Sequence, residues 1–315
     1  MSWEVDLIEW AQRAFGSFGA AAGKVFSFFG GETGILLVVL IVAFCWKKDV
    51  GMRLALIIAS VNAFLPMIKT AVLRPRPYME HPDRVKPLAL VETSAAADDV
   101  AAQGYSFPSM HAASASALYG SLALKIRKAW AWIASIAITL LIGVSRVMVG
   151  MHYPTDVLTG WAIGLACVGL YALLEKLVKQ MWLRPVILVI LALPGVFFVR
   201  TQDYYTALGL LIGAAAALPF ENRFVRYQDT TNLWARVIRP LGAFGIYFAL
   251  NTLLKLPFGK EFLSRAELLP LLIRAARYAV IVFVIFALYP KLFPLFEKIG
   301  GKKGGNAPVS PEEKL

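Results

Sequence analysis

The sequence "SRVMVGMHYPTD", residues 145–156, places a cation, an imidazole and a carboxylate between two strongly apolar runs. A carboxylate that holds the Nδ1–H of a histidine stabilises the charged ring and leaves Nε2 free to act as a base or nucleophile. The spacing of His152 and Asp156 permits such a hydrogen-bonded pair, and Arg146 lies close by in the sequence. The alternative is that Asp156 only favours the start of a helix.

A second stretch, "KTAVLRPRP", carries Lys69 and Arg76 at the end of another apolar run. Along a continuous helix their spacing would put Lys69 about 10 Å deeper than Arg76, on a similar face. Pro75 and Pro77 predict that the helix ends here, since proline disfavours α-geometry in the residue before it. The two cations are either ligands for an anion or charges that reach for the membrane interface.

The third stretch, "YSFPSMH", opens an apolar run with Pro108, Ser109 and His111. Proline suits the first turn of a helix, so Ser109 and His111 are predicted to stand at a helix N-terminus. The free N–H groups of such a terminus attract anions. The alternative is an ordinary helix start with an incidental histidine.

Membrane helices must position these residues. Of the 315 residues, 58% are hydrophobic and 17% charged, which is outside the usual range for a soluble domain. The net charge is +12, but the cations are scattered among the connectors of apolar runs, as the positive-inside rule predicts and as a nucleic-acid-binding face does not. Cys45 and Cys167 fall inside apolar runs and are predicted to be packing residues.

The sequence predicts an all-α, polytopic membrane bundle of about nine transmembrane helices, preceded by an interfacial helix. The interfacial helix is inferred from residues 3–18, whose aromatic and apolar side chains fall on one helical stripe. Spans are predicted near residues 31–46, 53–73, 109–124, 129–147, 156–174, 185–199, 204–220, 238–254 and 268–290. The predicted divisions are an amphipathic interfacial segment (1–30), a core bundle (31–200), additional C-terminal membrane helices (201–295) and a disordered tail (296–315).

Lys and Arg collect in the connectors that follow the first, third, fifth, seventh and ninth predicted spans. These connectors are therefore predicted to be cytoplasmic, with the N-terminus outside and the C-terminus inside. The three polar stretches then share the external face, which faces the periplasm, exterior or lumen. Several cations, a serine hydroxyl and two helix N-termini on one face favour a site for a tetrahedral phosphate.

The motifs Lys-x6-Arg-Pro, Pro-Ser-x-His and Ser-Arg-x5-His-x3-Asp resemble those of the type 2 phosphatidic acid phosphatase superfamily. The resemblance covers roughly residues 50–175. Many members have glycine where this chain has Met110, which narrows the expected pocket without removing a polar group. The span layout also looks like that of glucose-6-phosphatase, and "SRVMVGMH" looks like sphingosine-1-phosphate phosphatases.

The resemblance implies a role for each matching residue. His152 would attack phosphorus to form a phosphohistidine, supported by Asp156, and His111 would protonate the leaving oxygen. Lys69, Arg76, Ser109 and Arg146 would hold the non-bridging oxygens. No carboxylate cluster suggests a metal, so neither a metal nor another cofactor is expected.

The implied activity is removal of phosphate from a membrane lipid such as a polyprenyl phosphate or diphosphate, a phosphatidate or a sphingoid phosphate. The partners expected are this lipid and the bilayer, without nucleic acid; the sequence leaves the oligomeric state open. Hydrolysis of a soluble sugar phosphate, or phosphoryl transfer to another lipid, would use the same site. A lipid transporter or flippase is the alternative from another class, because Arg274 and Arg277 lie within an apolar span.

A long external connector, residues 78–107, joins the stretch carrying Arg76 to the one carrying Ser109 and His111. Connectors of this length usually have a function. It is either a lid or substrate guide beside the phosphate site, or a passive tether between two spans.

Overall fold

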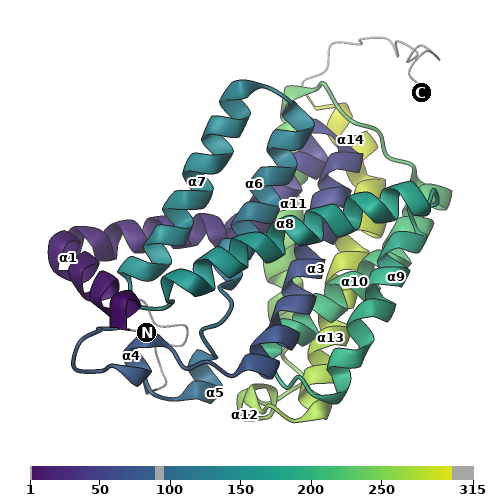
Figure 1. Ribbon diagram of the computed structural model, residues 1–315. Helices are drawn as coiled ribbons and strands as arrows, with labels where there is room; N and C mark the ends of the chain where they lie inside the picture. The colour runs from purple at the N-terminus through teal and green to yellow at the C-terminus, as the bar shows by residue number, and fades with distance from the viewer. Residues whose placement is uncertain (1, 89–95, 300–315) are drawn as a thin grey trace.

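The computed structural model describes residues 2–88 and 96–299, and within these ranges the chain forms helices and no β-strand (Figure 1). The all-α prediction is therefore confirmed. The helices are α1 (Ser2–Gly30), α2 (Glu32–Ile41), α3 (Lys48–Val72), α4 (Pro77–Glu80), α5 (Val100–Gln103), α6 (Met110–Ile126), α7 (Ala129–Met148), α8 (Pro154–Leu177), α9 (Leu183–Ala192), α10 (Gln202–Phe220), α11 (Leu233–Leu253), α12 (Lys260–Ser264), α13 (Leu268–Phe283) and α14 (Phe293–Glu297). Short π- or 3₁₀-helical turns extend α2, α9, α10 and α13.

The chain is a multi-span integral membrane protein, but the predicted count of about nine spans is not confirmed. Six segments within the described ranges are long and apolar enough to cross a membrane, and the bent pair Trp3–Gly30 and Glu32–Trp46 would make a seventh. The six are Lys48–Glu80, Ala129–Met148, Pro154–Leu177, Gln202–Val225, Leu233–Leu253 and Leu268–Glu297. Three predicted spans, 31–46, 109–124 and 185–199, are not among these six. They fall on α2 with its π-helical turn, on α6, and on α9 with its 3₁₀ turn, none of which has more than 17 residues. A helix of 15–17 residues covers about 22–26 Å, less than the hydrocarbon thickness of about 30 Å.

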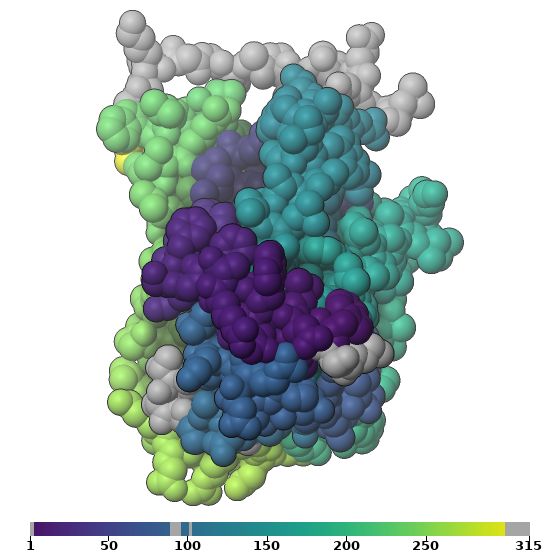
Figure 2. Space-filling view, turned by 60° about the vertical axis from the view of Figure 1, so that its left-hand side comes forward, coloured from purple at the N-terminus to yellow at the C-terminus, as the bar shows by residue number. Residues whose placement is uncertain are grey.

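Helix α1 is bent at Gly16, whose φ of 45° and ψ of −128° lie outside the helical region. A side chain is rarely tolerated at such a φ. In Figure 2 this segment, in purple, lies across one face of the molecule between α7 and the connector that follows α3. Val5 and Ile8 are buried against that connector, while Trp3 and Trp10 are exposed. The predicted apolar stripe therefore points away from the protein.

Two glycines of α8 allow α6 and α8 to pack closely. A Cβ added at Gly160 would lie 2.5 Å from the carbonyl oxygen of Ser109, and one at Gly164 would lie 2.1 Å from the hydroxyl of Ser116. Small residues let helix backbones approach in this way. The backbone N–H of Ser109 also donates to the carbonyl of Asp156 at 2.9 Å. The starts of α6 and α8, which carry two of the three polar stretches, are thereby held together.

The connector after α3 is fastened to α1. Gln12 Nε2 donates to the carbonyl of Lys86 at 2.7 Å, and Arg84 bonds the carboxylates of Asp6 and Glu9. Residues 89–95 of the connector, and the tail 300–315, which holds most of the segment predicted to be disordered, lie outside the described residues. The short helices α4, α5 and α12 lie at one end of the bundle, together with the start of α13 (Figure 1).

Candidate active site

His152 and Asp156 lie at the start of α8, where Pro154 occupies the first helical position. The His152 Nδ1 is 3.6 Å from the Asp156 Oδ2, which is too far for a direct hydrogen bond. The Ser106 hydroxyl lies between them: it donates to Asp156 Oδ2 and is 3.5 Å from His152 Nδ1. The two residues are therefore neighbours as predicted, but a serine that the sequence analysis did not select bridges them.

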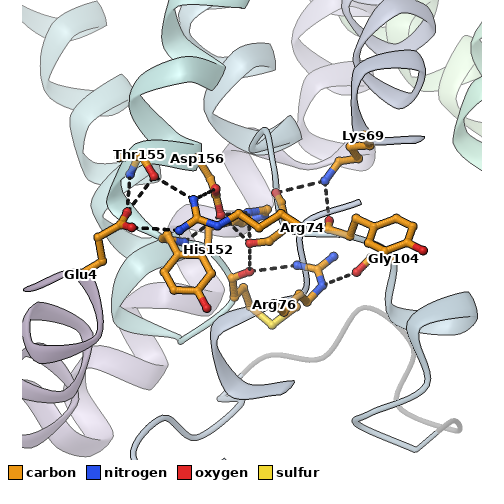
Figure 3. Close-up of polar contacts among 12 residues, drawn as sticks. Glu4, Lys69, Arg74, Arg76, Gly104, His152, Thr155 and Asp156 are labelled. Atoms are coloured by element: carbon orange, nitrogen blue, oxygen red, sulfur yellow. Dashed lines mark hydrogen bonds and ion pairs between the residues drawn. The ribbon is translucent and has the colours of Figure 1, made fainter. Parts of the chain in front are cut away.

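The other oxygen of the Asp156 carboxylate is bound by Arg74. Its Nη1 donates to Asp156 Oδ1 and to the Thr155 hydroxyl, each at 2.8 Å, and its Nη2 donates to Glu4 Oε2 at 2.9 Å. The guanidinium also stacks on the Tyr153 ring, 3.7 Å from its centroid. Figure 3 shows Arg74 lying between Glu4 of α1 and Asp156 of α8. A cation held by this many partners has little rotational freedom.

Lys69 and Arg76 lie on the other side of the site, and their partners are backbone carbonyls. Lys69 Nζ donates to the carbonyl of Tyr105 at 2.7 Å. Arg76 Nε donates to the carbonyl of Gly104 at 2.9 Å, and its Nη1 donates to that of Met151 at 3.1 Å. Figure 3 shows these cations on the side away from Glu4.

The predicted helical relation between Lys69 and Arg76 is wrong. Helix α3 ends at Val72, and its C-cap Leu73 has a φ of 55° in the left-handed region. Arg76 instead has extended backbone as the N-cap of α4, which begins at Pro77. The prolines predicted to end the helix do follow its end, because each restricts the residue before it. The turn directs Arg76 toward the carbonyls of Gln103, Gly104 and Met151.

Ser109 and His111 stand at the N-terminus of α6, as predicted. The Ser109 hydroxyl is buried, and within the described part of the chain it has no hydrogen-bond partner. Such a group is costly unless something binds it. His111 lies against the junction of α1 and α2, where a Cβ added at Gly31 would be 3.6 Å from its Nε2.

Arg146 is in the last turn of α7 and only 5% exposed. Its Nη1 donates to the hydroxyl of Ser27 in α1, while its Nε has no partner among the described residues. The second half of α1 therefore contributes a ligand to a predicted site residue. Neither Ser27 nor the α1–α2 junction was part of the predicted site.

The electrostatics of His152 show that the predicted cations converge on it. Its side chain is buried, and burial, followed by Arg76, Lys69 and Arg146, holds its pKa well below the usual value for histidine. Burial and nearby positive charge both disfavour the protonated ring. His111 is within electrostatic range of His152 and the same cations. The structure thus brings together every predicted site residue: Lys69, Arg76, Ser109, His111, Arg146, His152 and Asp156.

The residues that the sequence analysis missed differ in how visible they were. Arg74 and Ser106 lie inside the quoted stretches, and Arg74 stands two residues before Arg76 in "RPRP". An arginine and a serine so close to selected residues were detectable candidates. Glu4 and Ser27 come from α1, and no local pattern links them to residues more than a hundred positions later.

Two family models match the chain and together cover most of it. Residues 50–180 match the PAP2 superfamily, and residues 205–301 match the transmembrane extension of PAP2 superfamily phosphatases. The first match contains all the predicted site residues. No solved structure gives a significant match.

Three curated proteins resemble the chain over short regions. An undecaprenyl-diphosphatase of Sulfolobus acidocaldarius is 45% identical over 60 residues, which are 19% of this chain and 29% of that protein. A lipid A 1-phosphatase of Rhizobium etli is 40% identical over 73 residues, covering 23% of this chain and 29% of the relative. A phosphatidylglycerophosphatase B of Bacillus subtilis is 37% identical over 70 residues, covering 19% of this chain and 34% of the relative. The chain therefore spans about a third of the length of these relatives.

Proposed function

Because the chain belongs to the PAP2 superfamily, we propose that it is a membrane phosphatase that hydrolyses a lipid phosphate or diphosphate. One observation carries this proposal: the cations Lys69, Arg76 and Arg146 all act on the buried His152 ring. A neutral imidazole surrounded by fixed positive charge is suited to attack a phosphate anion. The same charges then stabilise the negative charge that redistributes in the transition state.

In the proposed mechanism, His152 Nε2 attacks phosphorus and forms a P–N bond as the bond from phosphorus to the lipid oxygen breaks. Burial and the neighbouring cations lower the pKa of His111, and the charge of the bound phosphate offsets their effect. The protonated His111 then gives its proton to that lipid oxygen, which leaves as an alcohol or a lipid phosphate. His111, now neutral, takes a proton from a water that attacks the phosphohistidine. The P–N bond breaks, inorganic phosphate is released, and both imidazoles return to their starting states.

We call Lys69 and Arg76 the clamp cations. The phosphate oxygens are proposed to bind where these two side chains contact backbone carbonyls. Exchange of a neutral carbonyl for an anionic oxygen strengthens each hydrogen bond of Lys69 and Arg76. The unpartnered hydroxyl of Ser109 and Nε of Arg146 supply further donors. These groups provide the electrostatic stabilisation directly, so we propose that the reaction is metal-independent.

Arg74 is proposed to be a positioning residue rather than a phosphate ligand. It is already bound to Asp156, Thr155 and Glu4. Asp156 in turn accepts a hydrogen bond from the Ser106 hydroxyl, which faces Nδ1 of His152. This chain of contacts fixes the orientation of the nucleophilic ring without touching the substrate.

A lipid substrate is favoured because the site lies where the membrane helices α3 and α7 end and α6 and α8 begin, beside α1, whose aromatic face is exposed. The three relatives are also named for lipid-linked phosphates or diphosphates. The head of such a lipid would enter the polar site while its tail remained in the bilayer.

Phosphate release by the purified protein tests this function. The substrates are phosphatidate, a polyprenyl monophosphate, a polyprenyl diphosphate and glucose 6-phosphate, each with EDTA present. We expect turnover of at least one lipid and its loss in His152→Gln, with wild-type rates in the control His81→Gln, which changes a histidine of the connector. Turnover by His152→Gln would contradict the mechanism, and loss in EDTA restored by Mg²⁺ would contradict metal independence.

We also propose that the site faces the periplasm, exterior or lumen, with the N-terminus outside and the C-terminus in the cytoplasm, on the distribution of Lys and Arg among connectors. The test starts from a variant with both native cysteines replaced by serine. A cysteine at Pro82 should then react with an impermeant thiol reagent in intact cells or right-side-out vesicles, whereas one at Lys298 should react only after permeabilisation. The reverse pattern would place the chemistry on the cytoplasmic side.

A further inference from the structure

Two arginines of the C-terminal extension lie in a membrane-spanning segment and bond only neutral groups. Arg277 is 5% exposed, and its Nη2 donates to the side-chain oxygen of Asn251 at 3.0 Å. Its Nε has no partner among the described residues. Arg274, one helical turn away, donates from Nε to the Thr206 hydroxyl at 2.7 Å. Intramembrane arginines are costly unless paired, and such positions mark functional sites.

A third cation lies beside them. Lys255 follows the end of α11, four residues after Asn251, whose carbonyl accepts a hydrogen bond from Arg277 Nη2 at 3.3 Å. Partial desolvation, followed by the charges of Arg277 and Arg274, lowers the pKa of the Lys255 ammonium group, although the side chain as a whole is exposed. The opposing charge that acts on Lys255 is that of Glu32. We call Lys255, Arg274 and Arg277 the extension cluster. With three cations set against one carboxylate, it carries excess positive charge.

The extension cluster adjoins the active site. The Tyr247 hydroxyl, next to the cluster on α11, donates to Oε1 of Glu32. Glu32 directly follows Gly31, where a Cβ would approach the His111 ring. On the other flank, Thr206 lies in the first turns of α10 together with Asp203, which is within electrostatic range of Lys69 and Arg76.

The depth of the cluster suits a lipid headgroup. The spanning segment that contains α13, Leu268–Glu297, has 30 residues. At helical rise this is about 45 Å, the thickness of a bilayer with its headgroups, of which about 7 Å on each side is polar. Arg274 and Arg277 lie about 9 and 14 Å from the start of the segment. They are thus at or just below the boundary between headgroups and hydrocarbon, within reach of a lipid phosphate.

We propose that the extension cluster is a second anion site, which binds a lipid phosphate group beside the catalytic pocket. The donors are the unpartnered Nε of Arg277, the Arg274 guanidinium and the Lys255 ammonium. The phosphate belongs either to the substrate itself, as a second phosphate distant from the one cleaved, or to a separate phospholipid. The first case rests on the proposed phosphatase function, whereas the second does not.

The test compares Arg277→Gln and Lys255→Gln with the control Arg265→Gln. All three substitutions remove one positive charge from the extension, but Arg265 is exposed and pairs with Glu261 and Glu267. Lys255 is also exposed, so its replacement does not threaten folding. Arg277→Lys, which keeps the charge, covers the case in which Arg277→Gln fails to fold, and thermal unfolding reports on folding in each variant.

The binding arm measures retention of phosphatidylglycerol and of phosphatidylcholine by native mass spectrometry of the purified proteins. The kinetic arm compares phosphatidate, which has one phosphate, with phosphatidylglycerophosphate, which has two, on the same acyl chains. Loss of one charge-assisted contact corresponds to about tenfold weaker binding.

If the substrate supplies the phosphate, Arg277→Gln and Lys255→Gln raise KM about tenfold for phosphatidylglycerophosphate and leave phosphatidate unchanged. If a separate phospholipid supplies it, the same variants lose phosphatidylglycerol while the ratio of the two KM values stays constant. Behaviour equal to that of Arg265→Gln in both arms overturns the proposal. A wild-type protein that retains phosphatidylglycerol through the cluster but hydrolyses neither these two lipids nor the polyprenyl phosphates contradicts the proposed function and leaves the anion site standing.

Discussion

The two sides of the candidate active site hold their cations in different ways. On the histidine side, Arg74 is bound by the carboxylates of Glu4 and Asp156, so its charge is neutralised within the protein. On the clamp side, Lys69 and Arg76 are bound by uncharged carbonyls, and no carboxylate of the described residues pairs directly with either of them. All three cations lie within one short stretch of sequence. Their side chains therefore serve different purposes despite their proximity in the chain.

The difference separates orientation from binding. A neutralised arginine attracts a phosphate weakly but fixes the groups around it, whereas cations on carbonyls bind anions strongly. The clamp side is therefore expected to determine transition-state stabilisation, and the histidine side to determine the geometry of attack. Variants on the two sides should differ in both the size and the kind of their kinetic defects.

The largest effect is expected on the clamp side. Arg76→Gln should lower kcat/KM for a lipid phosphate about 10³-fold, because it removes a charge that stabilises the developing negative charge. The matched control is Arg84→Gln, which removes an arginine of the same connector that bonds α1 and not the site. Phosphate-release kinetics measure both variants. Equal defects would mean that Arg76 acts through the fold of the connector.

A smaller effect of another kind is expected on the histidine side. Arg74→Gln should lower kcat about 30-fold with little change in KM, because Asp156, and through it the His152 ring, would no longer be held in one orientation. Arg74→Lys should recover part of the loss. A predominant rise in KM would contradict the comparison, since it would make Arg74 a substrate ligand like Arg76.

The titration of His152 offers a third way to sharpen the contrast. Burial and the clamp cations depress its pKa, so the folded protein should keep this ring neutral as the pH falls through the ordinary histidine range. The unfolded chain takes up the proton first, so this group should lower the stability of the fold below about pH 6.5. Nitrogen-15 NMR of labelled histidine, assigned with His152→Gln, measures the titration. Arg76→Gln should move the pKa of His152 upward. An unchanged pKa would show that Arg76 does not cause the depression.

The smallest effect is expected where α1 contacts Arg146. Ser27→Ala removes a hydrogen-bond acceptor from a cation that has other donors, so kcat/KM should fall about threefold. Ser17→Ala, a change of the same type elsewhere on α1, is the control. A loss as large as that of Arg76→Gln would mean that α1 is part of the clamp rather than a support for it.

The sequence was sufficient to predict a set of polar residues that the structure brings together, because each polar stretch interrupts an apolar run at a helix end. The all-α membrane class followed from the high hydrophobic content and the recurring apolar runs. The number of spans could not be predicted, since hydropathy does not distinguish a full span from the short apolar helices α2 and α9. Similarly, Pro75 and Pro77 indicated where α3 would end, but not that Leu73 would turn the chain so that Arg76 leaves the helix.

The contacts of Glu4 and the bridging position of Ser106 depend on tertiary structure. The amphipathic pattern of residues 3–18 placed Glu4 on a polar face, which is ordinarily in water. The structure buries Glu4 completely, because Arg74 of the turn after α3 and Thr155 of α8 bind it. A polar residue on a helix face can be solvated or paired, and local sequence cannot distinguish these states.

The contacts of α1 also have a consequence for biosynthesis. Ser27 bonds a residue 119 positions later, and Glu4 bonds residues 70 and 151 positions later. A ribosome that adds about 5–20 residues per second makes these partners many seconds after α1. During that interval Glu4 must remain near water, because a carboxylate without a partner is not stable in lipid. The first helix of the nascent chain is thus expected to wait at the membrane surface, and to take up its final position only once α8 has been synthesised.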